Sequence, residues 1–318
     1  RLDERQRAPS KPGVDAVDEA LTIGRAARIP VHIAHIKALG VDVHGQAPAI
    51  IAMIEAAQRA GQVVHADQYA WSASHTGLSA AVIPRSAQDG GRAAMLKRFD
   101  DAPTMEKMRP EIIENLRRRG GAASLLITSG PANAQGKTLE AFAKEQGIDP
   151  VAATIAILKQ SEARVASFNQ SENDIAAFML RPWVVTSSDA TLGHPRYYGS
   201  FARKYATYVK DAKVMSLQAF IDQSTSTTAT MFGLEGRGQL KVGAFADVIA
   251  FDPKTFASRA DYANPFLLAT GMRTVVVNGK VAIDNGAPTG VAAGRLLPRQ
   301  PIAGTCLPDP TIRPARYA

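Results

Sequence analysis

The 318-residue sequence contains a single cysteine, Cys306. One thiol can form neither an internal disulfide nor a multi-cysteine zinc site, so a bound metal ion must be held by His and carboxylate side chains. The sequence also lacks the uninterrupted apolar run of about 18 residues that a membrane-spanning helix requires. With 46% hydrophobic and 21% charged residues, the composition is typical of a globular protein, and no membrane association is expected.

Motifs for phosphate binding and for serine catalysis are absent as well. No GxxxxGK or GxGxxG follows a predicted strand, and no G-x-S-x-G elbow is present. The net charge of +8 comes from scattered Lys and Arg residues, which form a run only at 117–119. A scattered charge does not indicate a nucleic-acid interface, and it is compatible with attraction of a small acidic substrate.

An alternation of helix and strand begins near the start of the chain. Apolar positions at helical spacing predict a helix over 14–27, Pro30 ends it, and VHIAHIK at 31–37 predicts a buried strand. A helical pattern up to Gly61 and the strand QVVHADQY follow. Two strands joined by one helix form a βαβ unit, so we predict a parallel sheet with functional residues at the C-terminal ends of its strands.

Later segments are expected to continue this alternation. SLLIT at 124–128 predicts another strand, and WVVTSSDA at 183–190 predicts a last buried strand that opens into a loop. Helices are expected near 138–146, after an N-cap at Asp149, near 199–210 and near 216–231.

The pattern changes after Gly236. GQLKVGAFADVIAFDP and MRTVVVNGKVAIDNG predict β-ribbons, and Asn278-Gly279 predicts a two-residue hairpin turn. We therefore expect an α/β domain over residues 1–236 and a small β-domain over 237–318 that ends in an irregular tail.

Polar side chains gather where the predicted strands end. His35 and Lys37 lie at the end of one strand and share its face, so an imidazole suited to zinc stands beside an ammonium suited to a carboxylate. Asp189 and Arg196 follow a later strand, where they could transfer a proton and bind a carboxylate. The structural alternatives are a half-buried hydrogen-bonded His35, a turn cap at Asp189 and a surface ion pair at Arg196.

Other candidates compete for the same edge of the sheet. His65, Asp67 and Tyr69 share one face of their strand because they are two residues apart. We assign structural roles to the remaining histidines, which are His32, His44, His75 and His194.

Five segments together resemble the D-aminoacylase branch of the amidohydrolase superfamily: AVDEALTIGRAARIPVHIAHIKALG, HADQYAWSAS, SFNQSENDI, TSSDATLGHPRYYGSF and GRGQLKVGAFADVIAFDP. The likeness runs from about Val14 to Arg299, and the combination of H-x-K, S-D…H-P-R and G-x-x-A-D-x-x-x-F-D-P is more specific than any one motif. It implies an incomplete (β/α) TIM-like barrel of the metal-dependent hydrolase type, with a small C-terminal β-sandwich domain. It also implies zinc as the cofactor and hydrolysis of N-acyl-D-amino acids to a carboxylate and a D-amino acid.

The resemblance implies a role for each of six residues by motif position. His35 matches a zinc ligand, and Asp189 matches the catalytic aspartate that exchanges a proton with the attacking water and the leaving amine. Substrate-binding positions are matched by Lys37, Tyr69, Ser74 and Arg196. His65 matches no family ligand, so we do not retain it as one.

Several departures accompany the resemblance. Ala70 and Trp71 stand where the family has Pro-Tyr, and Ala190 replaces a glycine. The family's early H-x-H, its ligand cysteine and the histidine of its T-H-x-R segment would all precede Arg1, and RLDER at 1–5 resembles the segment just after that histidine. We therefore expect an N-terminally truncated chain whose natural start lies upstream and which has no deacylase activity alone.

Two other functions stay open. A hydantoinase-like or dihydroorotase-like enzyme would share the G-x-x-A-D pattern, although HPR after SSD argues against it. A catalytically inactive barrel that binds small acidic ligands is the second alternative. The acyl group, the D-side chain and the oligomeric state stay open too, and so does the compartment, for which a cytoplasmic location is favoured.

Overall fold

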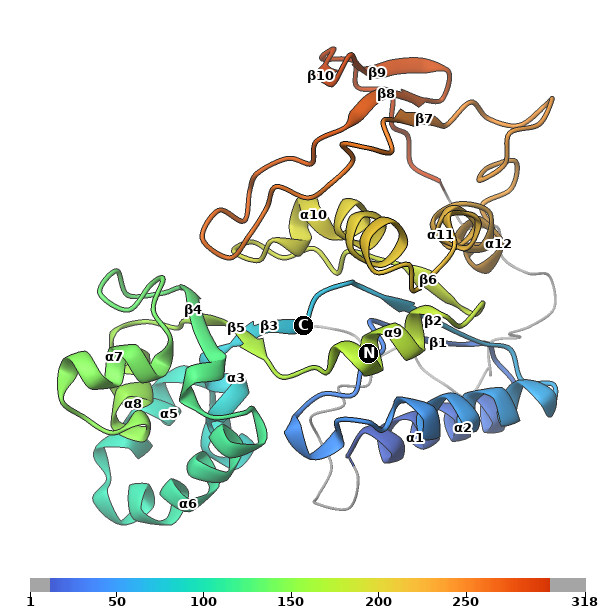
Figure 1. The fold of residues 1–318 in the computed structure, drawn as a ribbon. Helices are drawn as coiled ribbons and strands as arrows, with labels where there is room; N and C mark the ends of the chain where they lie inside the picture. Colours follow the sequence, from blue (N-terminus) through green and yellow to red (C-terminus); the bar gives the residue numbers. More distant parts are fainter. Residues whose placement is uncertain (1–11, 298–318) are drawn as a thin grey trace, which may run out of the picture.

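The computed structural model describes residues 12–297. The RLDER segment, Arg299 and Cys306 lie outside the described residues. Figure 1 shows three parts: a parallel sheet with helices on both sides, a lobe of helices around a small sheet, and an antiparallel sheet formed by the C-terminal strands.

The predicted βαβ unit is confirmed. Helix α1 (Pro12–Ala27) leads to β1 (Val31–Ile33), and α2 (Ala47–Arg59) connects β1 to the parallel strand β2 (Val64–Gln68). Strand β6 (Val184–Thr186) pairs with the other edge of β2, also in parallel, and the sheet order is β1-β2-β6. The C-terminal ends of the three strands therefore lie along one edge of the sheet.

One face of this sheet is packed against helices. Val64, Ala66 and Val184 share an apolar core with residues of α1 and α2 and with Phe178 of α9 (Glu172–Met179). Each fully buried Ile, Val or Phe side chain in such a core contributes about 1.5–3 kcal/mol. Because side chains alternate along a strand, the opposite face receives His65 and Asp67 of β2.

The SLLIT prediction was right about the strand and wrong about its direction. Strand β4 (Leu125–Ser129) is antiparallel to β5 (Arg164–Phe168), and β3 (Ala73–Gly77) completes a separate sheet of order β3-β5-β4. Two helices, α7 (Leu139–Gln146) and α8 (Pro150–Gln160), connect β4 to β5 and pack together. A short apolar run indicates a buried strand without indicating its direction.

This second sheet belongs to a lobe with an apolar core of its own, built around residues such as Leu78, Ile112 and Leu158. The predicted cap of α8 is confirmed, since the Asp149 carboxylate accepts hydrogen bonds from the Val151 and Ala152 amides at 2.9 and 3.1 Å. The remaining elements of the lobe are α3 (Leu78–Val82), α4 (Arg85–Gln88), α5 (Gly91–Asp100), α6 (Ala102–Arg118) and the 3₁₀ turn η2 (Ala122–Ser124), while η1 (Val41–Val43) precedes α2.

After β6 the chain forms helices and then the C-terminal sheet. These elements are α10 (Arg196–Arg203), the π-helical η3 (Lys204–Asp211), α11 (Leu217–Ser224), α12 (Ser226–Phe232), β7 (Val248–Phe251), β8 (Met272–Val277), β9 (Lys280–Asp284) and β10 (Ala287–Pro288). The sheet is antiparallel with order β10-β9-β8-β7. The hairpin is confirmed, because Asn278 and Gly279 both have the positive φ of a type I′ turn, 50° and 79°. A domain boundary after Gly236 stays a prediction.

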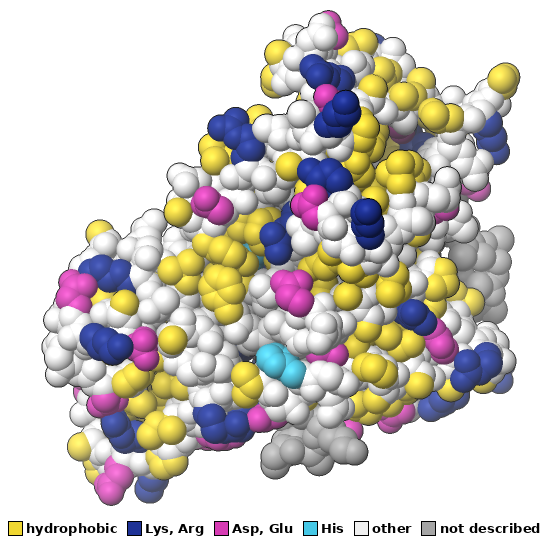
Figure 2. All heavy atoms as spheres, viewed as in Figure 1, with side chains coloured by type: hydrophobic (Ala, Val, Ile, Leu, Met, Phe, Trp, Pro, Cys, Tyr) yellow, Lys and Arg dark blue, Asp and Glu magenta, His cyan; other side chains and the backbone are white. Residues whose placement is uncertain are grey.

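Charge and hydropathy on the surface agree with the sequence pattern. On the face shown in Figure 2, Lys and Arg side chains are dispersed among acidic and apolar ones. Among the helices of residues 12–297, none combines the length and the apolar character needed to cross a membrane.

A buried lysine connects β6 to α11 through hydrogen bonds. Lys204 is 1% exposed, and its Nζ donates to Thr186 Oγ1 at 2.9 Å and to Gln223 Oε1 at 2.8 Å. Gln223 in turn donates to the carbonyl of Met179 at 3.0 Å. Burial lowers the pKa of Lys204 to about 7. The last residue of β6 is thereby connected through one polar network to α11 and α9.

The free energy of unfolding should rise between pH 7 and about 10, because the unfolded chain there retains a Lys204 proton that the folded chain has lost. The slope from this one group approaches about 1.4 kcal/mol per pH unit. Urea unfolding across this range should show that rise in the wild type, and the Lys204→Met variant should lack it. Lys210→Met, a change in the same π-helical segment at a partly exposed side chain, is the control and should keep it. Equal slopes in all three proteins would contradict the prediction.

Candidate active site

The segment after β1 differs in detail from the predicted strand over 31–37. Strand β1 ends at Ile33, and His35 occupies a turn with a φ of +44°. His35 and Lys37 meet through this turn rather than through the pleat of a strand. Lys37 Nζ lies 2.6 Å from His35 Nδ1 and donates to the His35 carbonyl at 2.5 Å. The side chains of His35 and Lys37 are neighbours, as expected, but a turn brings them together instead of the alternation of a strand.

Asp189 and Arg196 also come together. Asp189 lies in the loop after β6, as predicted, with a φ of +42°. Arg196 is the first residue of α10 rather than a loop residue, and its Nη2 lies 2.8 Å from Asp189 Oδ2. The alternative of a surface ion pair is wrong for Arg196, because this side chain is only 4% exposed. Its Nε is buried without a hydrogen-bond partner among the described residues.

Tyr69 connects the two pairs. It follows β2 directly and is 2% exposed. Lys37 Nζ lies 5.6 Å and Arg196 Cζ 4.5 Å from the centre of its ring, so both cations approach the same aromatic side chain. Gln170, in the loop before α9, donates to the Tyr69 hydroxyl at 3.1 Å.

Ser74 is the one predicted site residue that belongs to the other lobe. It lies in β3, is buried, and its Oγ is 3.2 Å from the side-chain amide of Asn169. Asn169 precedes Gln170, the partner of Tyr69, so adjacent residues of one loop contact Ser74 and Tyr69. The structure thus brings five predicted residues together and links Ser74 to them indirectly.

Asp67 has a larger part in this site than the sequence indicated. Its carboxylate accepts hydrogen bonds from the His35 amide at 3.0 Å and the Ser187 hydroxyl at 2.5 Å. Its Oδ2 also lies 2.7 Å from His32 Nε2. Only its place on the strand face of His65 and Tyr69 suggested a role. Gln170 lies in the SFNQSENDI segment that carried part of the resemblance, but the sequence assigned it no role.

The histidines assigned structural roles each have a hydrogen-bond partner. His44 Nε2 contacts the Asn169 carbonyl at 3.3 Å, and His194 Nε2 contacts the Ala73 carbonyl at 3.1 Å. His75 bridges Thr128 and Thr191. Burial lowers the pKa of His75 to about 3 and that of His194 to about 2, so both imidazoles are neutral at pH 7. His65 differs, since its buried Nδ1 has no partner among the described residues.

The electrostatics of the candidate site favour a neutral His35 imidazole beside an ionised Asp67 carboxylate. Burial, and then the nearby Lys37 ammonium, hold the pKa of His35 below its usual value. Burial alone would raise the pKa of Asp67, but the hydrogen bonds from His32, Ser187 and the His35 amide outweigh it and hold that pKa below its usual value.

The described residues do not complete a zinc site. No group of three or more His, Cys, Asp or Glu side chains within residues 12–297 is placed to hold a metal ion. A neutral His35 has the chemistry of a zinc ligand, but tetrahedral zinc sites use three or four protein ligands. A metal ion at this edge would need ligands other than those that the described part of the chain provides.

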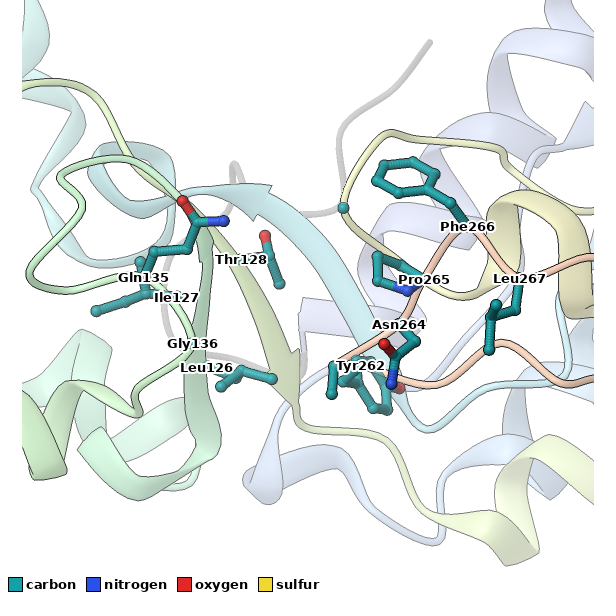
Figure 3. Close-up of a pocket in the computed structure, with 12 residues that line it drawn as sticks. Leu126, Ile127, Thr128, Gln135, Gly136, Tyr262, Asn264, Pro265, Phe266 and Leu267 are labelled. Atoms are coloured by element: carbon teal, nitrogen blue, oxygen red, sulfur yellow. The ribbon is translucent and has the colours of Figure 1, made fainter.

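A pocket of about 450 Å³ lies beside the candidate site. Figure 3 shows it between β4 and the segment 262–267. Its lining includes Leu126, Phe266 and Leu267 together with neutral polar groups such as Thr128, and none of the six predicted site residues contributes to it. The pocket is therefore distinct from the cluster around Tyr69.

The comparisons with known proteins agree on one family. The model of the amidohydrolase family matches residues 16–283. The chain is 31% identical to an N-acyl-D-glutamate deacylase of Alcaligenes xylosoxydans xylosoxydans, over 89% of this chain and 51% of that protein. It is 30% identical to a D-aminoacylase of the same organism, over 90% of this chain and 52% of that protein. The chain thus spans about half the length of the curated relatives it matches.

Solved structures agree. A D-aminoacylase structure with a binuclear metal centre superposes with a TM-score of 0.72 at 28% identity. The match covers 90% of this chain and 53% of that one. An N-acyl-D-glutamate deacylase of Bordetella bronchiseptica, solved with zinc and a phosphonate inhibitor, superposes with a TM-score of 0.66 at 28% identity. The match covers 86% of this chain and 52% of that one. The resemblance and the fold class inferred from the sequence are both confirmed.

This chain, incubated with zinc and then dialysed against zinc-free buffer, should retain far less than one equivalent of zinc, because the described residues contain no group of three or more side chains placed to hold a metal ion. Elemental analysis measures the content directly. The His35→Ala variant is the control, and it should retain no less zinc than the wild type. One tightly held equivalent that disappears in this variant would contradict the prediction.

Proposed function

The chain belongs to the amidohydrolase family, and on that basis we propose that it is part of a zinc-dependent hydrolase that cleaves the amide bond of N-acyl-D-amino acids. The relatives named above support the substrate class, because one is an N-acyl-D-glutamate deacylase and the other a D-aminoacylase. The observation that carries the proposal is the buried Arg196 guanidinium, which is stacked on Tyr69, paired with Asp189 and left with an unused Nε donor.

Arg196 and Lys37 are suited to bind the substrate's α-carboxylate. Both are buried, at 3% and 7% exposure, so a hydrogen bond from either to an anion is strengthened by the exclusion of water. A carboxylate also supplies the acceptor that Arg196 Nε lacks. With the carboxylate held over Tyr69, the configuration at the α-carbon decides where the amide points, which gives a preference for one enantiomer.

Asp189 is the candidate for proton transfer. A substrate carboxylate that binds Arg196 competes with Asp189 for the guanidinium. The freed Asp189 carboxylate accepts a proton as water attacks the amide carbonyl carbon. It returns that proton to the nitrogen when the carbon–nitrogen bond breaks, which yields a carboxylic acid and an amine; the acid then gives its proton to the amine, leaving a carboxylate and an ammonium. In this proposal His35 would be one ligand of a zinc ion that supplies Lewis-acid chemistry when bound, and the other ligands would come from sequence outside residues 12–297.

The first test compares this chain with a form extended upstream to the natural start, both assayed with zinc on N-acetyl-D-amino acids and their L-enantiomers. We expect hydrolysis of the D-substrates by the extended form only. Activity of this chain alone would contradict the truncation. If the extended form binds zinc and acidic ligands but hydrolyses nothing, the function is that of an inactive barrel.

In the extended form, Asp189→Asn should lower kcat by about 10²–10⁴-fold, because general acid–base catalysis has that magnitude. Arg196→Met should instead raise KM by about 10- to 100-fold, equivalent to the roughly 1.5–3 kcal/mol of a hydrogen bond to a charged group. Steady-state kinetics separate the two effects. Arg25→Met, which removes an exposed guanidinium that donates to Thr22 Oγ1 on α1, is the control and should match the wild type. Equal changes in both constants for both variants would contradict the separate roles.

A further inference from the structure

Asp67 joins the two segments that carry the candidate chemistry. It lies near the C-terminal end of β2, and its carboxylate binds the His35 amide at 3.0 Å and the Ser187 hydroxyl at 2.5 Å. Ser187 is two residues before Asp189. We infer that Asp67 is a positioning residue that fixes His35 and Asp189 relative to each other, an inference that rests on the hydrolysis proposed above.

The place of Asp67 in the sheet makes this possible. Strand β2 lies between β1 and β6, and neighbouring strands are about 4.8 Å apart, so a side chain on β2 reaches the segments that follow both neighbours. Main-chain bonds bring those segments close: the Ile36 amide donates to the Asp67 carbonyl at 2.8 Å, and the Ser187 amide donates to the Gln68 carbonyl at 2.9 Å. The carboxylate then fixes the turn that follows each strand.

Both turns need such support. His35 and Asp189 have φ angles of +44° and +42°, in the left-handed region that residues other than glycine seldom adopt. Each such residue costs about 1–3 kcal/mol and persists when its surroundings determine it. Asp67 binds the amide of His35 itself, so it acts directly on the first of these strained residues.

The arrangement of the three partners around Asp67 suits a carboxylate. The His35 amide and the Ser187 hydroxyl donate to Oδ1, and His32 Nε2 contacts Oδ2. A carboxylate accepts at both oxygens, whereas an asparagine has one acceptor and one donor group. Asp67→Asn therefore keeps the size of the side chain, replaces the charge-assisted hydrogen bonds at Oδ1 with weaker neutral ones, and puts a donor group in place of one acceptor oxygen.

The first experiment is amide hydrogen exchange of this chain, measured by NMR for the wild type and for Asp67→Asn. We expect faster exchange at the His35 amide, by about tenfold, since a charge-assisted hydrogen bond becomes a weaker neutral one. The amides of Val64 and Ala66, which lie in β2 with Asp67, should keep their protection from exchange. Exchange that increases equally throughout β2 would overturn the inference and assign Asp67 a general structural role. Exchange that increases nowhere would overturn it as well, because Asp67 would then order neither turn.

The second experiment measures kcat and KM in the form extended upstream. Asp67→Asn should lower kcat by about 10- to 100-fold, the loss expected when reacting groups move by about 1 Å, with KM within threefold of the wild type. Ser187→Ala removes only the contact to the β6 loop and should have a smaller effect in the same direction. Ser188→Ala, the neighbouring change in that loop, is the control and should match the wild type.

The outcomes separate the two proposals. A higher KM with unchanged kcat in Asp67→Asn would place Asp67 in substrate binding and overturn its positioning role. If the extended wild-type protein hydrolyses no N-acyl-D-amino acid, the proposed function fails, and the exchange measurement on this chain still decides whether Asp67 orders the two turns.

Discussion

The parallel arrangement of β1, β2 and β6 is the constraint on which the site depends. Each parallel connection returns the chain to the same side of the sheet, so all three strands end at one edge. Residues as distant in sequence as His35, Asp67 and Asp189 follow or end those strands and therefore meet. The apolar face packed against α1, α2 and α9 fixes the sheet, and its C-terminal edge carries the polar groups of the candidate site.

Patterns with a local physical cause predicted much of the fold. The periodicity of the apolar residues defined α2, a side-chain cap located the start of α8 at Asp149, and the need for positive φ placed a turn at Asn278-Gly279. The direction of β4 and the early end of β1 were not predictable in this way. Direction depends on how α7 and α8 return the chain, and the left-handed turn at His35 depends on contacts with β2 that only the folded chain provides.

The candidate site was predictable to a similar extent. Residue type and position after a strand identified His35, Lys37 and Asp189, because strand ends of a parallel sheet converge. The same reasoning could not show that Arg196 is buried on α10, since its burial arises from the packing of Tyr69. It also could not rank Asp67 above His65, because both share one strand face and only the loops that approach it distinguish them.

Pairing within the site limits what a ligand can do there. Lys37 is engaged by His35, and Arg196 by Asp189, so each buried cation already has a partner of its own chain. A buried charge without a partner is costly, and these contacts keep the site stable without a ligand. In the proposed reaction, a substrate carboxylate would compete with Asp189 for Arg196 rather than enter an empty site. Recognition and chemistry would then be coupled, because the anion bound by Arg196 would free the proposed proton acceptor.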